Sequence, residues 1–330
     1  MFDGRRISTR LALSYGAAAV LSWLFLRNAE WRVLQDGVRS VGWLLLGAAV
    51  LVRLASLIVS SLRWQRLLAP VRAVPLGPVV SAMMMGMAIS ALVSMQAAEV
   101  ARPYLLSRRA HLDFSATVAT VAVEWFLDLL AVLALFIPVR GLLTAGGHSG
   151  GSGVNATVAL LALGSVGGLL VLRFVPRAVT RLRGWVQRSA IVPERLRGRV
   201  AGHLEEFASG LRILAHPGGL TTVAAYSLLT SLLTAISAWL ALLAFGLPLS
   251  FLSGFVILGL ITVGGMIPTP GAVGGFHAVC QIGLMAMLHV DAAQTVAPVI
   301  GLHAVLYVPA AAVGALCFLW TKTERPRHLA

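Results

Sequence analysis

Six apolar stretches dominate the sequence, and each is long enough to cross the hydrocarbon core of a membrane. A helix rises 1.5 Å per residue, so a core of about 30 Å takes about 20 residues. Charged residues make up only 12% of the chain, about half of the roughly 25% found in soluble domains. We therefore predict an all-α, multi-pass membrane protein forming one domain over residues 1–330. The expected spans are about Ile7–Leu26, Val41–Leu62, Ala116–Val139, Val154–Phe174, Leu220–Phe245 and Thr295–Trp320.

Two further apolar regions do not fit a simple span: Leu76–Gln96 and Phe251–Leu288, the second interrupted by prolines and glycines. Irregular backbone inside a membrane persists only where protein or water covers it. We therefore predict two opposed re-entrant, broken helical segments, as in transporters with inverted repeats. Two proline-kinked ordinary spans are the alternative. The second segment is expected to bend at a buried elbow made of Pro268, Thr269, Pro270, Gly271, Gly274 and Gly275.

The positions of the basic residues predict the topology. With a cytoplasmic N-terminus and two re-entrant segments, 21 of the 26 basic residues fall on the cytoplasmic side, as the positive-inside rule requires. We therefore expect a bacterial-type cytoplasmic (inner) membrane protein with both termini in the cytoplasm. Residues 175–218 are predicted to form a basic cytoplasmic loop with an amphipathic helix, lying on the membrane surface or serving as a plain linker. The net charge of +14 thus indicates topology and attraction to anionic lipid headgroups, not nucleic-acid binding.

Several charged residues lie within the apolar stretches. Glu124 and Asp128 are four residues apart and share one helix face; each costs about 2.5–3.5 kcal/mol at the centre of a membrane helix. They line a polar cavity or form a structural ion pair. Arg53 lies in the middle of a span and is expected to need a partner such as Glu124 or Asp128.

Other polar residues are candidates at the edges of the spans. Glu99 and Arg102 can pair on one helix face, or Arg102 can meet a phosphate at the cytoplasmic mouth. His277 and His303 can titrate near neutral pH, although a lone membrane histidine more often bonds across a helix interface. Four arginines are expected at the cytoplasmic interface, near headgroups: Arg63, Arg66, Arg108 and Arg109. The sequence contains no catalytic motif, and we expect no metal and no cofactor.

The sequence resembles the membrane region of lysylphosphatidylglycerol synthases, a flippase-like domain, over almost its whole length. Four segments carry the resemblance: "LRWQRLL" (62–68), "AAEVARPYLL" (97–106), "VEWFLDLLAVL" (123–133) and "PTPGAVGGFH" (268–277). The resemblance implies that the charges of the second and third segments, and Pro268, Pro270, Gly271 and Gly274 of the fourth, are functional. The sequence departs from the usual pattern at Ala98 for glycine, Ser94 for proline, Trp125 for a basic residue and His277 for glutamate.

These features together predict lipid translocation by a flippase or scramblase-like transporter. The substrate would be an anionic phospholipid or a polyprenyl-phosphate-linked lipid whose headgroup passes a charged cavity between the broken helices. One alternative is an integral-membrane lipid-modifying enzyme, and another is a non-catalytic membrane partner of a lipid or glycan synthase. The expected partners are the lipid substrate, anionic headgroups, and a further copy of the chain or a synthase. Since the sequence offers no ATP site, transport would be passive or ion-coupled.

Overall fold

The structure is a computed structural model that describes residues 4–27, 31–145, 152–188 and 193–323. Within these ranges the regular secondary structure is entirely helical, which confirms the predicted all-α class. Among the described residues, six regions are long and apolar enough to cross a membrane. The α-helices are α1 Gly4–Leu26, α2 Trp31–Arg39, α3 Trp43–Leu68, α4 Leu76–Leu92, α5 Met95–Ala110, α6 Phe114–Ala145, α7 Ser152–Arg188, α8 Glu194–Gly210, α9 Pro217–Ala244, α10 Ser253–Gly265, α11 Gly275–Leu288 and α12 Ala292–Thr323.

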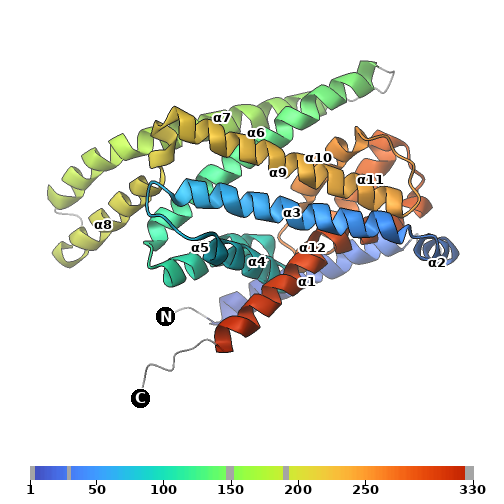
Figure 1. The fold of residues 1–330 in the computed structure, drawn as a ribbon, viewed down its shortest axis with the longest axis horizontal. Coiled ribbons are helices and arrows are strands. Elements are labelled where there is room, and N and C mark those ends of the chain that lie inside the picture. Colours follow the sequence, from blue (N-terminus) through green and yellow to red (C-terminus); the bar gives the residue numbers. More distant parts are fainter. Residues whose placement is uncertain (1–3, 28–30, 146–151, 189–192, 324–330) are drawn as a thin grey trace.

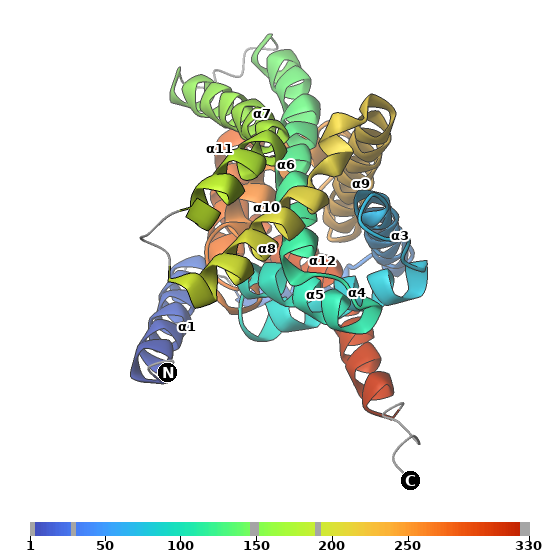
Figure 2. The same cartoon turned by 90° about the vertical axis from the view of Figure 1, so that its left-hand side faces the viewer.

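Five of the six predicted spans recur among these candidate spans. The sixth candidate span is Pro270–Leu288, which begins inside the predicted elbow. The predicted span Ile7–Leu26 corresponds to α1, where the apolar stretch found is the shorter Tyr15–Leu26. The predicted basic loop begins within α7, which continues as a single helix to Arg188. The amphipathic helix follows as α8, which packs against α6 and α7. Figure 2 looks onto this end of the molecule and shows α8 in front of α6.

Two four-helix units share one plan: a long helix, two short helices, and a second long helix. The first unit is α3–α6 and the second is α9–α12. Their packing is equivalent. The first short helix of each unit packs on the last long helix of the other unit: α4 on α12, and α10 on α6. The second short helix packs on the last long helix of its own unit: α5 on α6, and α11 on α12. The leading helices α3 and α9 lie side by side (Figure 1) and make the most extensive helix contact.

Hydrogen bonds show that α3 and α9 are antiparallel. The amide of Gly42, before α3, donates to the carbonyl of Ala244 at the end of α9 (2.8 Å), and Ser237 donates to the Ala49 carbonyl (2.8 Å). The second unit therefore runs in the opposite direction to the first. This is the arrangement of an inverted repeat, with the antiparallel pair of α3 and α9 at its centre.

The two short helices of each unit form an antiparallel hairpin. In the first hairpin Arg109 of α5 reaches Ser81 of α4, and in the second Gly264 of α10 faces Phe276 of α11. The 17 residues of α4 and the 13 of α10 span about 25 and 20 Å at 1.5 Å per residue, less than the membrane core of about 30 Å. Each predicted segment is thus broken into two helices, between α4 and α5 and between α10 and α11. That each hairpin enters the membrane and leaves it on the same side stays a prediction.

Five of the six predicted elbow residues of the second hairpin are buried, and Pro268 is exposed. Gly271 and Gly274 adopt positive φ angles of 62° and 83°, which glycine reaches without the strain that a side chain would add. A Cβ on Gly274 would lie 2.8 Å from the Ala18 carbonyl of α1, and one on Gly271 would lie 3.2 Å from the Ala91 carbonyl of α4. The irregular backbone is thus covered by neighbouring helices, which makes it tolerable at membrane depth.

Candidate functional site

Five charged side chains form one network where α3, α5 and α6 meet. Arg63 of α3 donates to both Glu124 and Asp128 of α6, with Nη2 3.0 Å from Asp128 Oδ2. Arg102 of α5 donates to Glu124 (Nη1 to Oε1, 3.2 Å) and to Glu99 (Nη2 to Oε2, 2.5 Å). Glu124 therefore bridges the two guanidinium groups, and the network joins three helices.

The network is buried at its centre and open at one edge. Arg63 and Glu124 are only 1% and 2% exposed, and Arg102 is 5% exposed. The Asp128 side chain is 40% exposed. With three carboxylates and two guanidinium groups, the formal charge of the network is −1. The exposed carboxylate of Asp128 thus belongs to a network with one more acid than base, in which Arg63 and Glu124 lie on helices apolar enough to span a membrane.

Neighbouring residues hold the network in position. The indole of Trp64, which follows Arg63, donates to Thr120 of α6 (3.1 Å). The Arg102 guanidinium lies 5.3 Å from the centre of the Trp64 ring, within cation–π range. Gly86 of α4 permits close packing, since a Cβ there would lie 3.2 Å from the Arg102 Cβ. The hydrogen bond of Trp64, its stacking with Arg102 and the close packing of α4 on α5 therefore all hold the charged side chains in place.

Arg63 is the residue that the sequence interpretation misplaced. It was expected to be an interface anchor, but it is the most buried cation of the network. A signal was present, since Arg53, Ser56, Ser60 and Arg63 recur at helical spacing and form a polar stripe on an otherwise apolar helix. Ser227 of α9 was also missed; its hydroxyl accepts from Arg63 Nη1 at 2.8 Å.

A comparison with protein families found a match that covers most of the chain. The family model of the lysylphosphatidylglycerol synthase TM region matches residues 7–314. The chain belongs to this family. None of the curated proteins compared with the chain matches it. The lysylphosphatidylglycerol synthase TM region is therefore the framework for comparing the residues below.

Two departures from the usual family pattern have a structural explanation. Trp125, where a basic residue is usual, donates its indole N–H to Glu99 Oε2 at 2.9 Å, so a neutral donor stabilises that carboxylate. Ser94, where a proline is common, is the N-cap of α5 and accepts from the Ala97 amide at 3.2 Å. Serine ends the break by capping the next helix, which proline cannot do with its side chain.

The expected pairing of Arg53 with Glu124 or Asp128 is wrong. Arg53 donates from Nε to the Leu306 carbonyl of α12 (3.1 Å) and from Nη1 to Ser56 (3.3 Å) and Thr234 (3.5 Å). Arg53 precedes Arg63 by ten residues, or about 15 Å along α3, and belongs to a different polar cluster. Arg63 takes the carboxylates instead.

His277 is linked to this second cluster through His303, whose ring stacks on that of Tyr307, the residue after Leu306. Its ring centre lies 5.1 Å from that of Phe25 and 4.7 Å from that of His303. Its Nδ1 accepts from the Gly274 amide at 3.4 Å, while His303 Nε2 donates to the Gly271 carbonyl at 2.7 Å. Both histidines therefore hold the backbone of the elbow.

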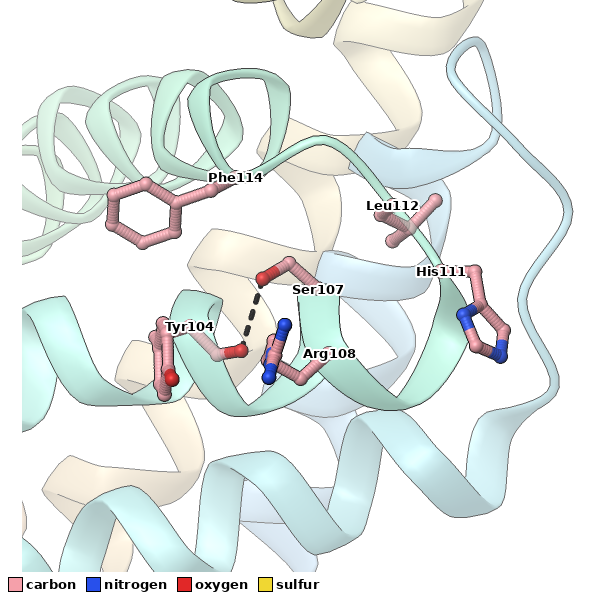
Figure 3. Close-up of a pocket in the computed structure, with 6 residues that line it drawn as sticks. All are labelled: Tyr104, Ser107, Arg108, His111, Leu112 and Phe114. Atoms are coloured by element: carbon pink, nitrogen blue, oxygen red, sulfur yellow. Dashed lines mark hydrogen bonds between the residues drawn. The ribbon is translucent and has the colours of Figure 1, made fainter.

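The remaining expected interface residues lie in different environments. Arg66 is exposed at the end of α3. Arg109 is directed inward and donates to Ser81 of α4 at 2.8 Å. Arg108 lines a surface pocket of about 530 Å³ where α5 ends and α6 begins (Figure 3). The pocket is lined by Tyr104, Ser107, Arg108, His111, Leu112 and Phe114. Within the described residues, no group of His, Cys, Asp and Glu is placed to hold a metal ion.

Proposed function

We propose that the protein translocates a lipid across the cytoplasmic membrane as a flippase or scramblase-like transporter. The observation that carries the proposal is the buried network of Arg63, Arg102, Glu124, Asp128 and Glu99, which lies beside a broken helical hairpin and is open at Asp128. A headgroup moving along this edge would meet charges in place of the water that it leaves.

The energetics favour a functional network over a structural one. Ionised side chains in a membrane are costly, and a buried ion pair adds little stability compared with apolar residues of similar size. Five charges with an unbalanced sum are thus an expensive way to hold three helices together. The same charges become useful as a polar surface along which a headgroup can pass through the membrane without being held.

The cytoplasmic side supplies an attractive surface for the substrate. In the topology that we propose, the α8 end of the molecule faces the cytoplasm, where exposed arginines attract anionic headgroups. The pocket beside Arg108 (Figure 3) combines a cation with the apolar and aromatic side chains of Leu112, Tyr104 and Phe114, which suits a headgroup with its first acyl carbons. Anionic phospholipids and polyprenyl-phosphate-linked lipids both have this chemistry.

A proteoliposome assay tests the proposal. Purified protein is reconstituted with fluorescent phospholipids or a polyprenyl phosphate, and the accessibility of the headgroup from outside is followed over time. We expect wild type to accelerate crossing of at least one lipid, and Glu124→Gln, Asp128→Asn and Arg102→Ala to lose most of that rate. Glu205→Gln, which alters an exposed ion pair with Arg183, is the matched control and should retain it.

Other outcomes identify the alternatives. Chemical conversion of a lipid that stops in Glu124→Gln would replace translocation with an integral-membrane lipid-modifying enzyme. No crossing and no conversion, together with co-purification of a lipid or glycan synthase, would identify a non-catalytic partner. Equal crossing rates in wild type and in every network variant would contradict the proposed role of the network.

A further inference from the structure

Arg53 carries a charge that no acid within the described chain balances. Its three hydrogen bonds go to the Leu306 carbonyl and to the hydroxyls of Ser56 and Thr234. Among the residues that the structure describes, no carboxylate lies within ion-pair distance of Arg53, and its Nη2 makes no hydrogen bond. An uncompensated guanidinium in the middle of a membrane helix is costly, which makes it a place where an anion is stabilised.

The inverted repeat places Arg53 at the counterpart of the charge network. The network is built on α6 and α5, with Arg63 from α3 and Ser227 from α9. The second cluster is built on α12 and α11, with Thr234 from α9 and Arg53 from α3. In the repeat, α6 corresponds to α12, α5 to α11, and α3 to α9. The two polar sites are therefore built on corresponding helices but carry different charges.

The second site is rich in donors. His303 and Tyr307 lie four residues apart on α12, as Glu124 and Asp128 do on α6, and their rings stack at 4.7 Å. The Tyr307 hydroxyl makes no hydrogen bond with any described residue. Because His277 Nδ1 accepts from the Gly274 amide, the neutral ring carries its proton on Nε2.

The N-terminus of α11 adds to the positive potential. This helix of 14 residues starts at the buried elbow, one residue before Phe276 and two before His277. Its first amides and helix dipole favour negative charge nearby. A guanidinium without an acid, a free hydroxyl and a helix N-terminus all favour the same kind of ligand, an anion that accepts several hydrogen bonds.

We propose that Arg53, Tyr307 and His277 form a phosphate-binding site in the half of the domain that contains the second hairpin. The inference rests on the proposed function and deepens it: the ligand is the phosphate ester of the translocated lipid. Phosphate suits the site because guanidinium groups bind its oxygens through paired, charge-assisted hydrogen bonds. The headgroup would thus leave the acidic network for a cationic site at the equivalent position of the other unit.

Calorimetric titration of the purified protein in detergent tests this site. The probes are dihexanoyl-phosphatidylglycerol, dihexanoylglycerol without phosphate, and inorganic phosphate. We expect Arg53→Gln to weaken binding of the phospholipid about tenfold or more, the loss typical of a charge-assisted hydrogen bond. Arg66→Gln, an exposed arginine on the same helix, removes the same charge and should bind within twofold of wild type. Binding of dihexanoylglycerol should be equal in all variants.

The outcomes separate the site from the proposed function. Unchanged phospholipid affinity in Arg53→Gln, or an equal loss for dihexanoylglycerol, overturns the site even if wild type translocates lipid. Arg53-dependent binding without translocation supports the site and contradicts the proposed function. Arg53-dependent binding of inorganic phosphate as well identifies a site for phosphate in general, and its absence identifies a site for the lipid headgroup. If Arg53→Gln does not fold, Arg53→Lys and Tyr307→Phe replace it: weaker binding in either supports the site, and unchanged affinity in both overturns it.

Discussion

Neutralising Glu124 should cost more stability than neutralising Asp128, although the two residues share one helix face and one arginine. Glu124 is 2% exposed and accepts from Arg63 and Arg102. Glu124→Gln weakens two charge-assisted bonds of about 1.5–3 kcal/mol each and turns an amide toward two cations. Since removing one partner of a buried ion pair typically costs about 3–5 kcal/mol, we expect a loss in that range.

Asp128→Asn provides the internal comparison. The Asp128 side chain is 40% exposed and pairs with one guanidinium, that of Arg63, whereas Glu124 pairs with two. The expected cost is therefore smaller, about 1.5–3 kcal/mol, the range for charge-assisted bonding to a single partner. Both substitutions change the formal charge of the network from −1 to 0, so their difference reports burial and pairing rather than net charge.

The free energy of unfolding of each variant can be measured in mixed micelles by titration with a denaturing detergent. Glu205→Gln controls for the chemistry of the substitution, because the Glu205 side chain is 60% exposed in its pair with Arg183; its expected change is below about 1 kcal/mol. The reasoning is refuted if Glu124→Gln and Asp128→Asn destabilise equally, or if Glu124→Gln matches the control.

Three further substitutions test local features of the fold by the same unfolding titration. Ser94→Ala removes the N-cap of α5 and should cost about 1 kcal/mol; an unchanged stability would contradict the capping role. Trp125→Arg places a cation beside the net negative network and should raise stability by up to about 1 kcal/mol; destabilisation would mean that the indole N–H is worth more than the added charge. Gly314→Ala directs a methyl group at the Met84 carbonyl of α4 and should cost about 1–3 kcal/mol. Gly77→Ala, with open space around the new methyl group, should cost nothing, and equal stabilities of these two variants would refute the close contact of α4 and α12.

Features governed by local rules were predictable from the sequence. Long apolar runs predicted the spans, and the spacing of Glu99 and Arg102 predicted a pair that the structure contains. The prolines and glycines between α10 and α11 predicted a break, because they lack donors or a Cβ. Burial of that break followed from the cost of irregular backbone in a membrane.

Pairings between distant helices were not predictable in the same way. Arg53 and Arg63 both lie on α3 among apolar residues, and only the packing of α6 decides which of them meets Glu124. Depth alone favoured Arg53, the more central of the two. The polar stripe that includes Ser56 and Ser60 indicates a buried face, yet it does not say which neighbouring helix covers that face. The length of α7 was likewise hidden, since the charges after Phe174 can continue a helix beyond the membrane as readily as end it.

The inverted repeat and its unequal charges together bear on which of the two sites holds the substrate. Equivalent helices surround both polar sites, so helix geometry alone would treat the two sides of the membrane alike. The chemistry does not: Glu124 and Asp128 occupy α6 where His303 and Tyr307 occupy α12. In the proposed function, an anionic headgroup is repelled by the surplus carboxylate of one site and attracted by Arg53 at the other. The two sites then differ in affinity for the same headgroup, and this difference gives a symmetric framework a preferred side for holding its substrate.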